Sequence, residues 1–238
     1  MTTILALDTS TDACSAALQR DGSLELRYQL SPRQHNHLLF SMLGELLPDG
    51  AAAAGIELIA YGQGPGSFTG LRVSASAVQG LAYTLSLPVA GVSTLACLAQ
   101  GALRESVVSE RETVFALIDA RINEIYWGLY RFENGLAVPC HEDQVSAPSE
   151  VPVELLQAQD TVVALGSGLS LAEDLPDAVR SAISKRVEDR WPSAQDLIPL
   201  AQSMAASGKL ISAAAVQPVY LRNEIHWKKL SEQGPRHG

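Results

Sequence analysis

The feature that most constrains the fold of this chain is a pattern that occurs twice. The segment ILALD at residues 4–8 matches FALID at residues 115–119, and each apolar run ends in an aspartate. Each copy continues with a polar turn, a second apolar run and an Xaa-Gly turn. Apolar runs joined by such turns are typical of β-hairpins. The sequence therefore predicts two related halves that each begin with a strand, an acidic turn and a hairpin.

Paired strands that end in aspartate indicate the duplicated actin-like (ASKHA) fold of actin, sugar kinases and Hsp70, in which two such turns face each other across a cleft. We expect an α/β protein with two lobes, at residues 1–108 and 109–215, and a C-terminal segment at 216–238 with a basic tail. We expect the last eight or so residues of this tail to be mobile. Ser193 and Asp196 have the spacing of a helix capping box. Apolar periodicity predicts helices at 36–47, 69–86, 94–103 and 194–206.

Composition limits the classes of partner. With 17 Lys and Arg against 26 Asp and Glu the net charge is −9, and an acidic surface repels nucleic-acid backbones at long range. Tight autonomous binding of nucleic acid is therefore not expected. No apolar run reaches the length of a membrane span and no signal peptide is evident, which favours a cytoplasmic protein. Cys14, Cys97 and Cys140 are widely spaced, which favours buried side chains over disulfides or a thiolate zinc site.

A glycine-rich turn, YGQGPGSFTGLRV at residues 61–73, lies between a predicted strand and a predicted helix. It lacks the lysine of the GxxxxGK[ST] phosphate loop, its glycine spacing misses GxGxxG, and Pro65 stands where GxSxG needs glycine. Two interpretations remain open. Gly64 and Gly66 can belong to a backbone-amide nest that binds an anion with help from Arg72, or the glycines allow strand and helix to approach closely.

The two acidic turns supply the other candidate groups for a nucleotide site. Asp8, Thr9 and Ser10 can hold a metal or hydrogen-bond a phosphate, or they can satisfy backbone amides within a polar turn. Asp119 is a candidate for the same site, or Asp119 and Arg121 pair with each other or cap a turn. The residue types alone do not separate these alternatives.

Five segments together resemble the TsaB (YeaZ) family. The resemblance extends from Ile4 to about Lys229. It implies a two-lobed actin-like fold and a role in forming N6-threonylcarbamoyladenosine (t6A37) at position 37 of tRNAs that read ANN codons. The segments are ILALDTST, GPGSFTGLRV, LPVAGVS, IDARINEIYWGLY and PVYLRNEIHWKKL.

The resemblance also implies that this chain has no catalytic metal. The related catalytic partner, TsaD, carries an HxxxH metal pair shortly after a strand that ends in Gly-Val, and Thr94 and Leu98 occupy the aligned positions here. Leucine has no ligating atom, and a lone threonine hydroxyl binds iron or zinc poorly. His35 and His37, two residues apart, cannot chelate one ion from a helix. We therefore expect no metal, no cofactor and no catalytic residue.

The favoured hypothesis is a non-catalytic scaffold that binds and activates a TsaD-like transferase. By the same resemblance, a TsaE-like ATPase belongs to the system, tRNA is reached only through the complex, and the isolated chain can form a homodimer. The alternative is an enzyme in its own right, either an ATP-dependent transferase or a metallopeptidase-like hydrolase of the same fold.

We predict the partner surface on helix 69–86, with helix 36–47 beside it. Opposite its apolar stripe, helix 69–86 carries small residues that let a foreign helix come close. The alternative is that both faces of this helix are buried within the monomer. The predicted interface residues are His35, Leu39, Met42, Gly70, Ser74, Ala77 and Gly80.

Overall fold

The computed structural model of the chain describes residues 2–32 and 34–222. The last eight or so residues, which are predicted from the sequence to be mobile, lie outside the described residues. The first sheet contains β1 (Ile4–Asp8), β2 (Ala13–Arg20), β3 (Ser23–Leu30), β4 (Leu58–Gly64) and β5 (Val89–Ser93). The second contains β6 (Thr113–Arg121), β7 (Glu124–Glu133), β8 (Leu136–Pro139), β9 (Gln144–Ser146), β10 (Val162–Leu165) and β11 (Ile183–Val187). The helices are α1 (His35–Leu46), α2 (Phe68–Leu85), α3 (Thr94–Arg104), α4 (Val153–Gln157), α5 (Asp177–Ala182) and α6 (Ala194–Ala206), with 3-10 segments η1 (Pro148–Glu150), η2 (Ser167–Asp174) and η3 (Ala213–Ala215).

The two sheets have corresponding strand arrangements. The order is β3-β2-β1-β4-β5 in the first and β11-β10-β6-β7-β8 in the second, with β9 paired to β7. The strand β1 is antiparallel to β2 and parallel to β4, and β6 is likewise antiparallel to β7 and parallel to β10. The repeat seen in the sequence therefore corresponds to a repeated unit of structure.

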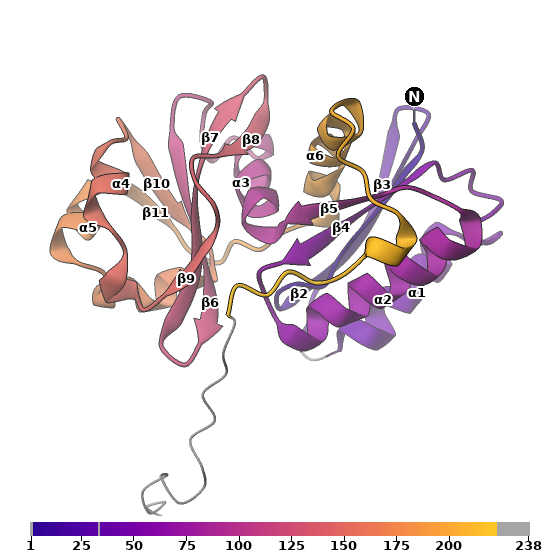
Figure 1. The fold of residues 1–238 in the computed structure, drawn as a ribbon, viewed down its shortest axis with the longest axis horizontal. Coiled ribbons are helices and arrows are strands. Elements are labelled where there is room, and N and C mark those ends of the chain that lie inside the picture. The colour runs from indigo at the N-terminus through magenta and orange to yellow at the C-terminus, as the bar shows by residue number, and fades with distance from the viewer. Residues whose placement is uncertain (1, 33, 223–238) are drawn as a thin grey trace, which may run out of the picture.

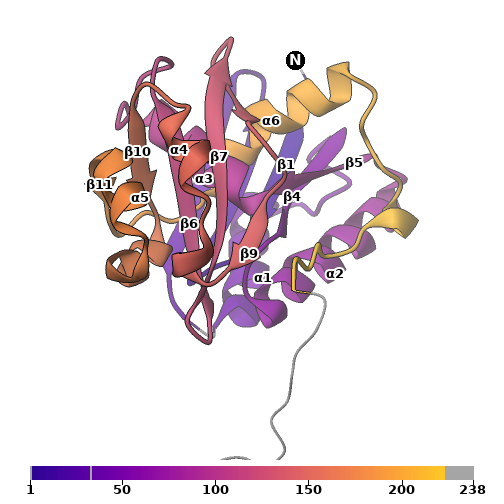
Figure 2. The same ribbon diagram turned by 60° about the vertical axis from the view of Figure 1, so that its left-hand side comes forward.

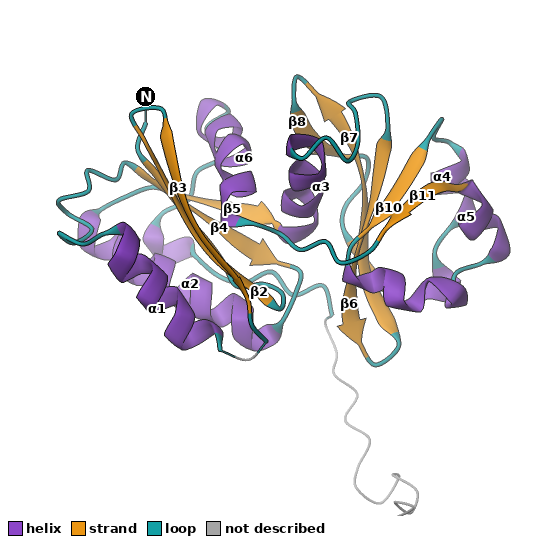
Figure 3. Ribbon diagram, turned by 180° about the vertical axis from the view of Figure 1, so that it is seen from behind, coloured by secondary structure: helices purple, strands orange, loops and turns teal. Residues whose placement is uncertain are grey.

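Each sheet is covered by helices on both faces (Figure 1). Because successive side chains of a strand point to opposite faces, Leu5 and Leu7 of β1 pack toward α1 and α2, whereas Ile4 and Ala6 pack toward the centre of the molecule. The α1 and α2 layer is seen from behind in Figure 3, and Figure 2 shows α4 and α5 on the outer face of the second sheet. Burial on both faces explains why the central strands β1 and β6 are apolar at most positions, whereas the exposed edge strand β3 also carries polar residues.

Helices α3 and α6 lie between the two sheets and join them into one core (Figure 1). The helix α6 falls in the range predicted for the C-terminal lobe, yet it packs against β1, β2, β4 and β5 of the first sheet. Its first amide, Ala194 N, donates to Ser15 Oγ of β2 at 2.9 Å. The lobe boundaries predicted from the sequence stay predictions.

The four helices predicted from periodicity are confirmed to within one residue at each end. The predicted capping box is wrong. Ser193 is the N-cap of α6, but its side chain makes no capping hydrogen bond. The carboxylate of Asp196 instead accepts from Arg104 of α3, with Nε–Oδ1 at 2.6 Å, because α3 lies beside α6. In the part of the chain that is described, none of the helices has both the length and the apolar character needed to cross a membrane.

Candidate functional site

The glycine-rich loop between β4 and α2 packs directly on the acidic turn that follows β1. Ser67 N donates to Ser10 O at 2.7 Å, and Thr9 Oγ1 donates to Gly70 O at 2.7 Å. A Cβ atom at Gly66 would lie 2.2 Å from Ser10 O, and one at Gly70 would lie 1.9 Å from Thr9 O. Both distances are too short for any side chain. The glycines therefore allow close packing, which was one of the two interpretations of this loop.

This packing encloses the carboxylate of Asp8. Asp8, Thr9 and Ser10 are all fully buried. Asp8 Oδ1 accepts from Ser10 N at 3.0 Å and from Ser10 Oγ at 2.8 Å, whereas Oδ2 has no hydrogen-bond partner within the described structure. Burial raises the pKa of the Asp8 carboxyl from 3.8 to about 6, against the opposing effect of the Ser10 hydrogen bonds. The turn satisfies only Oδ1 of this carboxylate, and burial keeps the unpartnered Oδ2 from a ligand that approaches from solvent.

The remaining candidates for a nucleotide site also make local contacts. Asp119 Oδ2 pairs with Arg121 at 2.9 Å, as one of the alternatives predicted. The Arg72 guanidinium lies 3.8 Å from the centroid of the Phe68 ring, and its Nε donates to Tyr220 Oη at 3.1 Å. Arg72, the cationic side chain that was a candidate for anion binding, is thus engaged with protein groups.

A contact that sequence reasoning missed covers the glycine loop from outside. The C-terminal segment 217–222 runs across this loop toward β6 (Figure 1). Val219 N donates to Gln63 O at 2.7 Å, and a Cβ atom at Gly64 would lie 2.5 Å from Val219 O. Arg222 then reaches the second sheet, where it pairs with Glu124. No local sequence pattern predicts these contacts, because Arg222 and Glu124 are 98 residues apart and Val219 lies still further from Gln63.

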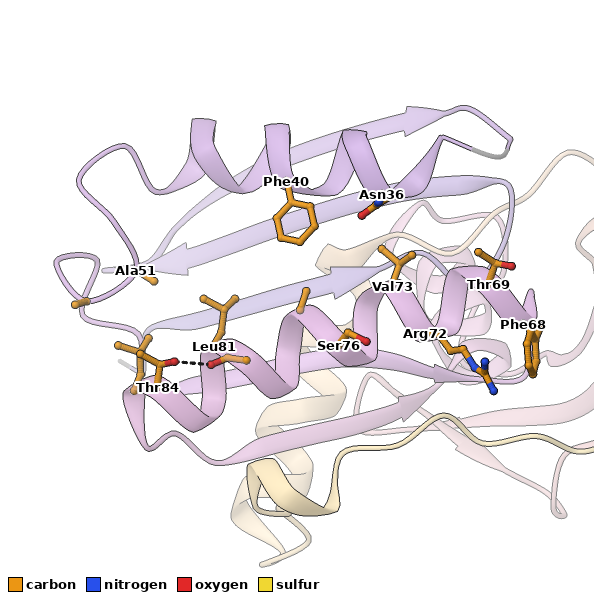
Figure 4. Close-up of a pocket in the computed structure, with 14 residues that line it drawn as sticks. Asn36, Phe40, Ala51, Phe68, Thr69, Arg72, Val73, Ser76, Leu81 and Thr84 are labelled. Carbon is orange, nitrogen blue, oxygen red and sulfur yellow. Dashed lines mark hydrogen bonds between the residues drawn. The ribbon is translucent and has the colours of Figure 1, made fainter.

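The exposed face of the first lobe carries a groove between α1 and α2, called here the α1–α2 groove (Figure 4). Its volume is about 1000 Å³. Phe40 of α1 points toward α2, and its side chain is 59% exposed. An exposed apolar surface of this kind marks an interaction site in many proteins. The lining residues are Asn36, Phe40, Ala51, Ala52, Phe68, Thr69, Arg72, Val73, Ser76, Ala77, Gly80, Leu81, Thr84 and Leu85.

Only part of the predicted interface set lies on this groove. Ala77 and Gly80 line it, and a Cβ atom at Gly80 would have no neighbour within 4 Å. The structure buries the remaining five: His35, Leu39, Met42, Gly70 and Ser74.

The expectation that Ser74 faces outward is wrong. Ser74 is fully buried, and its Oγ donates to Leu71 O of the same helix at 3.2 Å. The buried face of α2 is wider than its apolar stripe, since a small hydroxyl satisfied by its own helix fits the core. The exposed small residue of α2 that sequence reasoning missed is Ser76, two positions further along.

Comparison with known proteins assigns the chain to a family. A family model described as TsaD, tRNA N6-adenosine threonylcarbamoyltransferase, matches residues 29–218. The chain is 40% identical over 229 residues to the tRNA threonylcarbamoyladenosine biosynthesis protein TsaB of Escherichia coli, covering 95% of this chain and 97% of that protein. The chain belongs to the TsaB family. A second TsaB, from Haemophilus influenzae, is 35% identical and covers 96% of this chain and 97% of its own length.

A solved TsaB-family structure confirms the fold. YeaZ from Pseudomonas aeruginosa is 39% identical, with a TM-score of 0.84, covering 93% of this chain and all of the YeaZ chain. The predicted α/β, duplicated actin-like fold is therefore correct, as is the resemblance to the TsaB (YeaZ) family.

In this TsaB-family chain, the positions aligned with the TsaD histidine pair lie at the start of α3. Thr94 and Leu98 are both buried, and Thr94 Oγ1 has no hydrogen-bond partner in the described structure. Across residues 2–32 and 34–222, no three His, Cys, Asp or Glu side chains are grouped closely enough to hold a metal ion. That the protein has no catalytic metal stays a prediction.

Proposed function

We propose that this TsaB-family chain is a non-catalytic subunit that binds and activates a TsaD-like transferase, in the formation of N6-threonylcarbamoyladenosine at position 37 of tRNAs that read ANN codons. The names of the E. coli and H. influenzae relatives support the pathway. The observation that carries the proposal is the α1–α2 groove, because it is an exposed apolar surface on the lobe predicted to meet the partner.

The shape of the α1–α2 groove suits an amphipathic helix of the partner. Small side chains of α2, namely Ser76, Ala77 and Gly80, line the groove, with Phe40 and Phe68 also exposed along it. Small residues allow the larger side chains of an incoming helix to enter, which is how helices dock into grooves. Arg72 alone among the lining residues carries a charge, and depletion of charge is typical of the centre of an interface.

The closed acidic turn supports a non-catalytic role. Asp8 is buried beneath the glycine loop, so its carboxylate is not accessible to a bound nucleotide. In this proposal the catalytic groups belong to the TsaD-like subunit, a TsaE-like ATPase completes the system, and tRNA is bound through the complex in the cytoplasm. Without its partner, the groove is available to a second copy of the chain.

A charge placed in the α1–α2 groove tests the proposal. Ser76 lines the groove, whereas Ser41 is an exposed residue of α1 outside the groove lining. Ser76→Arg and Ser41→Arg make the same chemical change on two helices. An unpaired charge buried in an interface costs several kcal/mol, so Ser76→Arg should weaken the complex with the TsaD-like partner at least about 100-fold.

Both variants should keep the melting temperature of the parent protein, because both serines are exposed. Titration calorimetry with the TsaD-like subunit measures affinity, and tRNA modification by the reconstituted components measures activation. Equal affinity in the two variants would show that the partner binds elsewhere.

A further inference from the structure

A second cavity, of about 690 Å³, lies between the two sheets. It is bounded by β5, α3, α6 and the β7–β8 hairpin, which gather at the centre of the molecule in Figure 1. Its volume falls within the range of small-molecule sites, which is about 300–1,000 Å³. None of its lining residues lines the α1–α2 groove, so it is a separate feature.

Three polar side chains converge on one wall of this cavity. Ser93 Oγ donates to Asp143 Oδ2 at 2.5 Å, and Tyr130 Oη donates to Asp143 Oδ1. Ser93 Oγ also accepts from Leu95 N at 3.1 Å and from Ala96 N at 3.3 Å, at the start of α3. The cluster joins β5 of the first sheet to β7 of the second.

The hydroxyl hydrogens of Ser93 and Tyr130 limit what this cluster can still bind. Each hydroxyl has a single hydrogen, and Asp143 receives both. Ser93 Oγ is further occupied by two helix amides. With both hydrogens on Asp143, the 3.2 Å contact between Ser93 Oγ and Tyr130 Oη has no hydrogen to share. The capacity that remains is the lone pairs of the Asp143 carboxylate and of Tyr130 Oη, which accept and do not donate. A ligand of this wall must therefore be a hydrogen-bond donor, and anions are repelled.

The charge around the cluster favours a cation. No Lys, Arg or His side chain forms an ion pair with Asp143 in the described residues. Glu133 and Glu142 also line the cavity, and the basic side chains among its lining residues are Lys209 and His141, of which His141 acts to lower the pKa of Asp143. Burial raises the pKa of the Asp143 carboxyl, which reflects the cost of holding this charge away from water. A cation beside it would offset that cost.

We propose that this cavity binds a small organic cation, namely a protonated amine attached to an apolar chain or ring. The ammonium donates to Asp143 and Tyr130, and the apolar body lies against Leu200 and Met204 of α6. Because the wall is built from both sheets, a bound cation contacts both lobes at once.

The probes are a matched pair, 2-phenylethylammonium and 3-phenylpropanoate, which share a ring and chain length and differ in charge. Titration of the full chain by NMR at pH 8 should give a Kd of about 1 mM for the ammonium, an ordinary value for a fragment of this size. The carboxylate should not bind. Equal binding of the two probes would overturn the proposal.

Three variants locate the binding. Asp143→Asn keeps the size of the side chain and should weaken ammonium binding at least about tenfold, because a charge-assisted hydrogen bond is lost. Glu142→Gln removes an exposed charge from the same cavity and should change affinity less than about twofold. Ala96→Leu leaves Asp143 intact but narrows the cavity beside Ser93, and should also weaken binding at least about tenfold.

The variants also show how the proposal fails. An equal loss of affinity for 2-phenylethylammonium in Asp143→Asn and Glu142→Gln would mean that the probe responds only to surface charge. If Asp143→Asn does not fold, Ala96→Leu decides, and unchanged binding in that variant would place the ligand elsewhere.

Discussion

Replacing Asp8 with asparagine should change how the stability of this protein depends on pH. Asp8 is fully buried, and its Oδ1 accepts two hydrogen bonds from Ser10. The amide oxygen of asparagine can accept the same two bonds at the same position. Asp8→Asn therefore removes the charge and leaves the turn otherwise intact.

The magnitude follows from the pKa of Asp8, which burial raises from 3.8 to about 6. A group with a raised pKa binds its proton more tightly in the folded state, so the free energy of unfolding is highest below pH 3.8 and falls as the pH rises to about 6. At 1.36 kcal/mol for each pKa unit, the total loss is about 3 kcal/mol. The ionised carboxylate therefore destabilises the folded protein at neutral pH.

The assay is urea denaturation of the parent protein and Asp8→Asn between pH 4 and pH 7.5. The free energies of unfolding should be nearly equal at pH 4, and the variant should exceed the parent by up to about 3 kcal/mol at pH 7.5. Asp21→Asn removes an exposed carboxylate from the β2–β3 turn and controls for net charge. A difference between Asp8→Asn and the parent that is constant across this pH range would refute the reasoning.

Two further predictions concern the glycines and the nucleotide. Gly70→Ala should lower the free energy of unfolding by more than about 2 kcal/mol, because its Cβ would lie 1.9 Å from Thr9 O. Gly80→Ala, in the same helix but with open space around it, should raise the free energy by up to about 1 kcal/mol, and urea denaturation compares the two directly. The isolated chain should bind ATP with a Kd of hundreds of micromolar or weaker, since the acidic turn is closed. Low-micromolar affinity in calorimetry would contradict this last prediction.

Much of the fold could be predicted because the signals were local and repeated. The apolar runs that end in Asp8 and Asp119 became β1 and β6, which occupy matching positions in their sheets. Long helices such as α2 had enough turns for a period of 3.6 residues to emerge. The short helices α4 and α5, of five and six residues, provide too few turns for such a signal.

The candidate site was harder to predict because it depends on which face of a helix is buried and on distant contacts. Ser74 and Ser76 are the same residue type on one helix, and only the packing of α2 on the first sheet separates core from groove. The cluster of Ser93, Tyr130 and Asp143 joins positions up to 50 residues apart. Hydrogen bonds of this kind leave no spacing pattern in the sequence.

The position of α6 has a consequence for how the chain folds during synthesis. The inner face of the first sheet, which includes Ile4 and Ala6, is covered by a helix that begins only at Ala194. While the ribosome is still making the second sheet, that apolar face has no α6 to cover it. The inner face of the first sheet therefore stays partly exposed to water and to chaperones until nearly the whole chain has emerged from the ribosome.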